Sequence, residues 1–419
     1  MWPKTALGEL ISALIDTPAF QRLRHIRQNG VTNLVFHGAE HSRFAHSIGV
    51  AWTASKMLDA IERNSGEHIA GEVREDTILA ALLHDVGHGP FSHTLEEILE
   101  RKHFDHEAMT VRFLTEQGSE IAELLEASSA GRPQRLAQYI DKGLRTEHHW
   151  WHDVVSSQLD ADRLDYIQRD ARMAGIDNHR PDIARLICHV SSHEDRLVVD
   201  HRAFDVVESM LLALDHLYGA VYFHRTVRAA TVMVQAVLSR VTARGAQDLP
   251  EGDPLRTLLE QRKEIALDDY VRVGDATFWY HLDRWSRSED NELRCYADRL
   301  RRRQFPKHLA VPHDAWNKTR KLESKARELV SAKFPGFDPN ALVVLDEPTR
   351  VNYKRYEPGG ESPIFTWERD ATRTRRIEDI EEDRSIVPKA ARKIYRSRIF
   401  VPAEIFDELR TFATQERLL

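Results

Sequence analysis

One long stretch of apolar residues at helical spacing constrains the fold more than any other feature of the chain. Residues 204–241, FDVVESMLLALDHLYGAVYFHRTVRAATVMVQAVLSRV, repeat apolar side chains at intervals of three and four. This pattern predicts one long core helix or two abutting helices. Residues 42–62 and 75–85 have the same period. We therefore expect an all-helical core from Leu10 to about Arg240.

The stretch at residues 75–85 carries its own boundary signals. Asp76 is the expected N-cap, because its side chain can accept a hydrogen bond from a backbone N–H of the first turn. The following VGHGP, residues 86–90, is expected to end the helix, since glycine and proline do not continue one.

The pattern changes after residues 242–254. Short helices are expected up to about Ala332, followed by strands between proline and glycine turns. The expected strands lie in residues 341–348, 350–368 and 395–402. They predict a small mixed sheet with a closing helix at residues 403–415, and residues 371–385 are the expected mobile loop. The chain is thus expected to be mainly α-helical, with three parts: a core over residues 1–245, a helical extension packing on it over 246–335, and a small α+β C-terminal lobe over 336–419.

Composition sets limits on the class of protein. The chain has 419 residues, 42% of them hydrophobic, which is enough for one large domain with an appendage. The net charge of −7 comes from interleaved acids and bases and argues neither for nor against nucleic acid. Cys188 and Cys295 lie far apart, so neither a disulfide framework nor a cysteine zinc site is expected. We expect a cytoplasmic protein with no membrane span, because no export signal and no run of about 18 apolar residues is present.

Histidine and aspartate are concentrated in residues 82–93, LLHDVGHGPFSH. His84 and Asp85 are adjacent at an expected helix end, while His46 and Asp162 lie on two other expected helices. A divalent ion with open coordination positions needs imidazoles and carboxylates that converge from rigid elements. Each of these residues alone is more often a cap or a surface residue. Together they indicate a metal site.

The order of these motifs resembles the HD superfamily of metal-dependent phosphohydrolases, and within it the deoxynucleoside triphosphate triphosphohydrolase branch. The resemblance rests on six segments between Thr17 and Thr226: TPAFQRLRHIRQNG, HSRFAHSIGV, LLHDVGHGPFSH, FDHEAM, LDADRLDYIQRD and VYFHRT. It implies an HD-domain helical core over residues 1–245 and one divalent ion, Mn, Fe, Mg or Zn. The implied metal ligands are His46, His84, Asp85 and Asp162. Asp160 or Asp165 could orient the imidazoles, with helix capping and solubility as the alternative roles.

The resemblance also implies the groups that act on the α-phosphate. These are His88, His106, His93 and Arg43. Imidazole can activate water or protonate a leaving oxygen near neutral pH, and a guanidinium can offer two donors to phosphate oxygens. A hydrogen-bonded core histidine is the alternative role for His93.

The implied substrate contacts form a separate group. They are Gln28, Asn29, Tyr166, Asp170, Tyr222, His224 and Arg225. Tyr166 and Asp170 are expected to hydrogen-bond a 3′-hydroxyl group. A tyrosine-rich core helix is the alternative interpretation of Tyr218 and Tyr222.

Three positions depart from the family pattern. Leu214, eight positions before Tyr222, replaces an arginine that helps to hold the terminal phosphates. Asn29 replaces a leucine that presses against the 2′ carbon of the sugar, and an asparagine could hydrogen-bond a hydroxyl group there. His37 replaces the usual proline of its loop. Arg225, Arg228 or a lysine from a neighbouring subunit could replace the lost arginine.

The resemblance favours hydrolysis of (deoxy)nucleoside triphosphates to nucleoside and triphosphate, by a homo-oligomer. Leu214 motivates an alternative, an HD-type nucleotidase or phosphodiesterase acting on a nucleoside monophosphate, a cyclic or linear phosphodiester or a modified nucleotide. A second alternative is a nucleotide-sensing or nucleic-acid-binding regulatory protein. Its binding strip would be Arg299, Arg301, Arg302, Arg303 and Lys307. The competing interpretation of that strip is a solvated helix face or a subunit contact, since few aromatic residues are interleaved.

Overall fold

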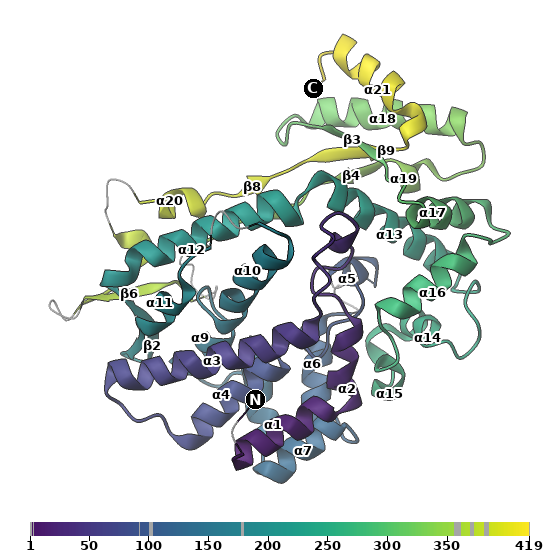
Figure 1. Ribbon diagram of the computed structural model, residues 1–419. Helices are drawn as coiled ribbons and strands as arrows, with labels where there is room; N and C mark the ends of the chain where they lie inside the picture. The colour runs from purple at the N-terminus through teal and green to yellow at the C-terminus, as the bar shows by residue number, and fades with distance from the viewer. Residues whose placement is uncertain are drawn as a thin grey trace.

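The architecture is mainly helical, in agreement with the expected fold class (Figure 1). This computed structural model describes residues 2, 4–91, 93–99, 104–176, 180–355, 362–368, 373–380 and 385–418, without the side chain of His93. The first eleven helices are α1 Ala6–Asp16, α2 Pro18–Gln21, α3 Arg43–Ser65, α4 Gly71–Leu83, α5 His93–Leu99, α6 His106–Thr115, α7 Glu120–Ser128, α8 Arg132–Ile140, α9 Trp150–Val155, α10 Ala161–Met173 and α11 Ile183–Cys188.

Helix α3 is the central element beneath the site. It packs against both α4 and α10, and its buried face includes Val50, Met57 and Ile61, which recur at helical spacing. The helix ends at Gly66, whose φ of 74° is the left-handed conformation that glycine adopts without strain. The polar residues at the N-terminal end of α3 therefore face the junction with α4 and α10.

The long apolar stretch forms two helices, the second of the two expected forms. Helix α12 spans Phe204–Leu217 and α13 spans Arg225–Ala243, with a π-type turn at Tyr218–Tyr222 between them. The chain bends by 57° at this junction. Among the described residues, no single helix has the length and hydropathy needed to cross a membrane; only this bent pair passes that test. π-type turns often mark functional positions, and this one turns tyrosines toward the cavity described below.

The N-cap predicted at Asp76 is wrong. Helix α4 begins at Gly71, so Asp76 lies inside the helix and is buried. Its carboxylate accepts hydrogen bonds from the Nε atoms of Arg132 and Arg135, at 2.8 and 2.7 Å. Two arginines of α8 satisfy a charge that the local sequence pattern assigned to a helix end. The predicted end of the helix before residues 86–90 is confirmed.

The all-helical expectation for the core is also wrong at one place. Strands β1 Val190–His193 and β2 Arg196–Asp200 form an antiparallel hairpin. Glu194 and Asp195 make its two-residue turn, with φ values of 49° and 53°. Such a turn needs positive φ at both positions and usually contains asparagine or glycine, so this sequence gave little signal for it.

The rest of the chain begins with four helices and then alternates short strands and helices. These elements are α14 Pro254–Gln261, α15 Leu267–Tyr270, α16 Asp275–Trp285, α17 Asn291–Arg301, β3 Lys307–Ala310, α18 Trp316–Lys333, α19 Pro339–Leu342, β4 Val344–Asp346, β5 Thr349–Arg350, β6 Phe365–Glu368, β7 Arg373–Arg376, α20 Val387–Ala390, β8 Ile394–Tyr395, β9 Arg398–Val401 and α21 Ala403–Gln415. The closing helix predicted at residues 403–415 is confirmed.

The strands belong to three small sheets rather than to the single sheet that was expected. Their orders are β1-β2-β6-β7, β3-β9-β4 and β5-β8. Strand β2 pairs in parallel with β6, so the hairpin of the core and the C-terminal segment share one sheet. The mobile loop predicted at residues 371–385 is wrong for 373–376, which form edge strand β7; a run of arginines is common on such an edge. Residues 371, 372 and 381–384 of the predicted loop lie outside the described part. The three-part domain division stays a prediction.

Candidate active site

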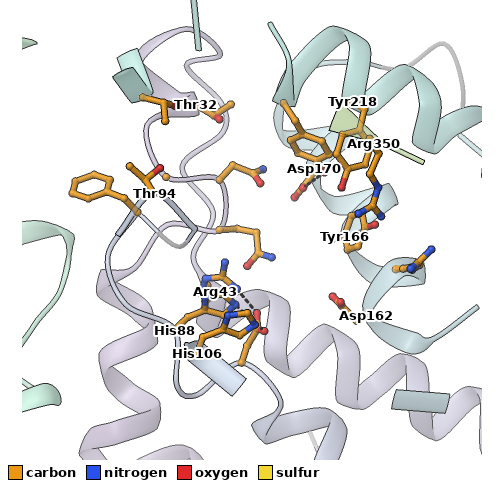
Figure 2. A pocket seen from close by; sticks show the side chains of 18 of the residues that line it. Thr32, Arg43, His88, Thr94, His106, Asp162, Tyr166, Asp170, Tyr218 and Arg350 are labelled. Atoms are coloured by element: carbon orange, nitrogen blue, oxygen red, sulfur yellow. Dashed lines mark hydrogen bonds and ion pairs between the residues drawn. The ribbon is translucent and has the colours of Figure 1, made fainter. Parts of the chain in front are cut away.

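Three helices bring the predicted metal ligands to one place. His46 lies on α3, His84 and Asp85 follow α4, and Asp162 lies in the first turn of α10. Above them is a cavity of about 590 Å³, whose lining includes Asp85 and Asp162 (Figure 2). The figure shows Arg43, His88 and His106 on one side of the cavity floor and Asp162 across from them. The site is thus assembled from segments more than 100 residues apart.

The ligand atoms lie within coordination reach of a common point. His46 Nε2 is 3.0 Å from Asp162 Oδ1 and 3.8 Å from Asp85 Oδ2. His84 Nε2 is 3.3 Å from Asp85 Oδ1 and 3.8 Å from Asp162 Oδ1. One atom from each of His46, His84 and Asp162 lies within 4.8 Å of the others. Two imidazoles and two carboxylates of this kind form a donor set that can hold a divalent ion.

The orientation of the two imidazoles fits a metal site. His46 Nδ1 is 2.8 Å from Asp165 Oδ2, and His84 Nδ1 donates to the carbonyl oxygen of Ala81 at 2.9 Å. Both Nε2 atoms are buried, and among the described residues neither makes a hydrogen bond of good geometry. Metal-binding histidines are commonly fixed in this way through the second ring nitrogen. Gly49 makes the arrangement possible, because a Cβ there would lie 2.1 Å from Asp165 Oδ1.

The electrostatic environment keeps the carboxylates ionised. Burial alone raises the pKa of Asp85, but His84, Arg43 and His88 outweigh it and hold that pKa well below its usual value. Burial likewise raises the pKa of Asp162, but the close contact with His46 and its charge lower it overall. Burial lowers the pKa of His46, yet Asp162 and Asp165 raise it to about 10. A divalent ion can take the place of the proton that these two carboxylates favour.

A second group of side chains adjoins the ligands. The rings of His88 and His106 stack with 3.8 Å between centroids and 13° between planes. His88 Nε2 lies 3.4 Å from Asp85 Oδ1, and His106 Nδ1 lies 2.6 Å from Glu96 Oε1. Glu96 was missed by the sequence analysis; its only signal was its place one helical turn beyond His93. The side chain of His93 lies outside the described part of the structure.

The turn that carries His88 is fixed by two side chains from distant parts of the sequence. Buried Arg22 donates from Nη2 to the carbonyl oxygens of Val86 and His88, at 2.9 and 2.8 Å. The hydroxyl of Tyr270 donates to the carbonyl oxygen of Gly87 at 2.7 Å, and the Arg22 guanidinium lies over the Tyr270 ring. Three successive backbone carbonyls are therefore fixed by two side chains to which the sequence analysis assigned no role.

The residues predicted to contact sugar form the opposite side of the cavity. Asp170 is held by two hydrogen bonds, one of 2.7 Å to His41 Nε2 and one of 2.5 Å from the hydroxyl of Tyr222. Tyr166 lies beside it and also lines the cavity. His41 begins one of the six quoted segments, but the sequence analysis assigned it no role, because its partner lies 129 positions away. The other predicted residues that line the cavity are Gln28, Asn29 and Arg43.

His224 and Arg225 are not brought into this lining. His224 caps α13, accepting from the N–H of Thr226, and its ring meets Phe36 edge-on at 5.5 Å. Arg225 is exposed. Leu214 is fully buried in the core. The basic side chains that do line the cavity are Arg43, Lys142, Arg163, Arg228 and Arg350.

Comparison with known proteins agrees with this geometry. The family model described as HD domain matches residues 43–170, and the model described as HD associated region matches residues 181–253. The uncharacterized protein YwfO of Bacillus subtilis is 34% identical over 359 residues, covering 84% of this chain and 79% of that protein. The chain therefore belongs to the HD-domain superfamily of metal-dependent phosphohydrolases.

Within the superfamily, the chain is similar to the deoxynucleoside triphosphate triphosphohydrolase SAMHD1 of Danio rerio. The two are 35% identical over 211 residues, which is 41% of this chain and 32% of that protein. A phosphohydrolase from Bacteroides thetaiotaomicron has the same fold over 95% of this chain and 96% of its own, with a TM-score of 0.78 and 24% identity. A hypothetical protein from Aquifex aeolicus gives a TM-score of 0.72 at 25% identity, over 96% of this chain and 95% of its own. The fold shared with these structures thus extends through the C-terminal segment.

Proposed function

We propose that this protein is a metal-dependent hydrolase that converts (deoxy)nucleoside triphosphates to nucleoside and triphosphate. One observation carries the proposal: Asp85 and Asp162 of the metal-binding group, the stacked histidines and the Asp170–Tyr222 pair all border one cavity of about 590 Å³. The name of SAMHD1, with which the chain shares 35% identity over its HD region, supports the same substrate class. The expected homo-oligomer remains part of the proposal.

His46, His84, Asp85 and Asp162 are the residues that would hold the ion. When bound, a divalent ion there would polarise a phosphate oxygen and lower the pKa of a bound water. The four side chains supply two neutral donors and two negative charges, which balance the ion locally. The stacked histidines and Arg43 border the same floor, so a phosphorus atom placed over the ligands lies within their reach.

The two stacked imidazoles divide the proton transfers between them. Burial, together with the nearby charges of Arg43 and His106, holds the pKa of His88 well below its usual value, so this ring is neutral and can accept a proton from water. Burial lowers the pKa of His106, but Glu96 raises it overall, so this ring carries a proton. As the water oxygen bonds to the α-phosphorus, the bond to O5′ breaks, and His106 donates its proton to the departing O5′.

The sugar is positioned by the opposite wall. Asp170 accepts from Tyr222 and is bound to His41, which leaves its carboxylate fixed at the cavity edge. With Tyr166 it would bind the 3′-hydroxyl group. Asn29 also lines the cavity and would contact the 2′ position.

The experiment that tests the proposal uses purified full-length protein with Mn²⁺ or Mg²⁺ and each dNTP and NTP in turn. Chromatography with phosphate analysis should detect nucleoside and tripolyphosphate in equal amounts. Release of inorganic phosphate alone would show cleavage at another phosphorus and would reject the proposal. Asp162→Asn, which removes a ligand charge, should abolish the reaction.

A second candidate is a nucleotidase or phosphodiesterase of the same metal chemistry. It is favoured by buried Leu214 and by Arg228, which is bound to Asp346 at 2.5 Å across the cavity wall. Nucleoside monophosphates and bis(p-nitrophenyl) phosphate in the same assay distinguish the two candidates. The nucleic-acid alternative gains no support from its strip, since Arg299 pairs with Glu404, and Arg301 and Arg302 pair with Asp298.

A further inference from the structure

Arg350, on strand β5 of the C-terminal segment, lines the cavity. Arg350 pairs through its backbone with Ile394 of β8, and its guanidinium lies 4.7 Å from the centre of the Tyr218 ring. Figure 2 shows the side chain pointing into the cavity beside Tyr166 and Asp170. The residue follows α10 by more than 170 positions, and no motif in the sequence indicated it.

The Arg350 side chain differs from two other arginines of the cavity, for which hydrogen bonds to carboxylates are seen. Its Nε is buried and, among the described residues, makes no hydrogen bond. Arg228, by comparison, makes two hydrogen bonds to Asp346, and Arg43 is bound to Asp85. A buried guanidinium N–H without an acceptor costs free energy, and an anionic ligand would remove that cost.

Arg350 shares its patch of the cavity with a second cation. Arg163 follows Asp162 on α10 and lines the same cavity. Burial raises the pKa values of Tyr166 and Tyr218, and the charges of Arg163 and Arg350 both act against that rise. The guanidinium groups of Arg163 and Arg350 therefore both lie near the hydroxyl groups of Tyr166 and Tyr218. Two positive charges at one place attract a ligand with more than one negative charge.

Arg350 also lies near the position where Leu214 replaces the arginine of the family pattern. Tyr218 lies four positions after Leu214, so both occupy the same side of the α12 chain and its π-type turn. Arg350 stacks on Tyr218, about one turn beyond the point where the family resemblance predicts an arginine. The C-terminal segment thus supplies a guanidinium that the helix itself lacks.

We infer that Arg350, together with Arg163, binds the outer phosphates of a nucleoside triphosphate. This inference rests on the proposed function, in which the α-phosphate lies over the metal ligands next to Arg43. A nucleoside monophosphate would place its only phosphate there and leave the Arg163–Arg350 patch without an anion. A triphosphate fills both positions, so this patch selects against monophosphates.

The test measures binding of inorganic tripolyphosphate to the full-length protein by isothermal titration calorimetry in the presence of Mg²⁺. Arg350→Ala should weaken binding about tenfold or more, the range expected for a lost charge-assisted pair, and Arg350→Lys should weaken it less. Arg396→Ala is the matched control, because Arg396 is exposed beside β8 and does not line the cavity. It should bind as the wild type does. Thermal melting verifies that each variant is folded, and Arg350→Lys keeps the test valid if the alanine variant unfolds.

Equal binding by Arg350→Ala and wild type would overturn the inference, as would a wild-type affinity for tripolyphosphate no higher than for inorganic phosphate. Steady-state kinetics provide the second readout. KM for nucleoside triphosphates should rise in Arg350→Ala and should stay at the wild-type value in Arg396→Ala. Failure of the proposed function would appear differently, as wild-type protein that binds tripolyphosphate but releases none from any nucleotide.

Discussion

His88 and His106 stack face to face, yet their surroundings move their pKa values in opposite directions. His88 is fully enclosed and close to Arg43, which disfavours a second positive charge. His106 hydrogen-bonds Glu96, whose carboxylate favours the imidazolium form. Two neighbouring rings with separated pKa values can serve as base and acid in one reaction.

Glu96→Gln should therefore shift the alkaline limb of the kcat–pH profile to lower pH. In the wild type the pKa of His106 is raised, so its proton is retained as pH rises above the usual histidine range. Without the carboxylate that proton is lost earlier, and the rate should fall about tenfold or more at mildly alkaline pH. Glu97→Gln is the control, because Glu97 is on the same helix but binds Gln235. An unchanged alkaline limb would exclude His106 as the acid.

Asp165→Asn should weaken metal binding by about 10- to 100-fold, because the carboxylate fixes the ring of His46 through Nδ1. Each protein is dialysed against a series of chelators of known metal affinity. The metal that stays bound, measured by inductively coupled plasma mass spectrometry, gives the affinity of the site. Gln168→Ala, on an exposed position of α10, should bind metal normally. Equal affinity in wild type and Asp165→Asn would mean that His46 needs no such support.

Tyr270→Phe should lower both stability and kcat. The change removes the hydrogen bond to the Gly87 carbonyl oxygen and leaves that buried acceptor unpaired, at a cost of about 1–3 kcal/mol. The turn that carries His88 also loses one of its two supports. Urea denaturation measures the first effect and steady-state kinetics the second. Tyr280→Phe, at a position that is 65% exposed, should change neither.

Asn29→Leu should increase discrimination against ribonucleotides. Asn29 lines the cavity, and its amide can pair with a 2′-hydroxyl, whereas an apolar wall leaves that hydroxyl unpaired. The ratio of kcat/KM for a dNTP over the matching NTP should rise about tenfold. If the ratio does not change, Asn29 is not in contact with the 2′ position.

The site residues that could be predicted from the sequence are those that lie in short, recognisable motifs. His46, His84, Asp85 and Asp162 each sit in a recognisable segment of a periodic helix, and the structure brings all four together. Their supports were harder to find. Asp165 was proposed only as one of two orienting carboxylates, and its contact with His46 spans 119 positions.

Longer-range contacts were missed altogether. Arg22 reaches Val86 across 64 positions and Tyr270 reaches Gly87 across 183, and neither pairing leaves any periodic trace in the sequence. The turn at Glu194 failed for a different reason: non-glycine residues adopt its positive φ because the flanking strands determine the turn geometry. Local propensity describes helices well and long-distance pairing poorly.

The cavity combines residues that are synthesised early and late, because β2 pairs in parallel with β6 and β5 contributes Arg350 to the lining. The four metal-ligand residues leave the ribosome within the first 162 positions, whereas Arg350 and β6 follow nearly two hundred residues later. Contacts of such separation form slowly, because a long loop must close first. A nascent chain thus contains all four predicted metal ligands long before Arg350 can complete the cavity wall.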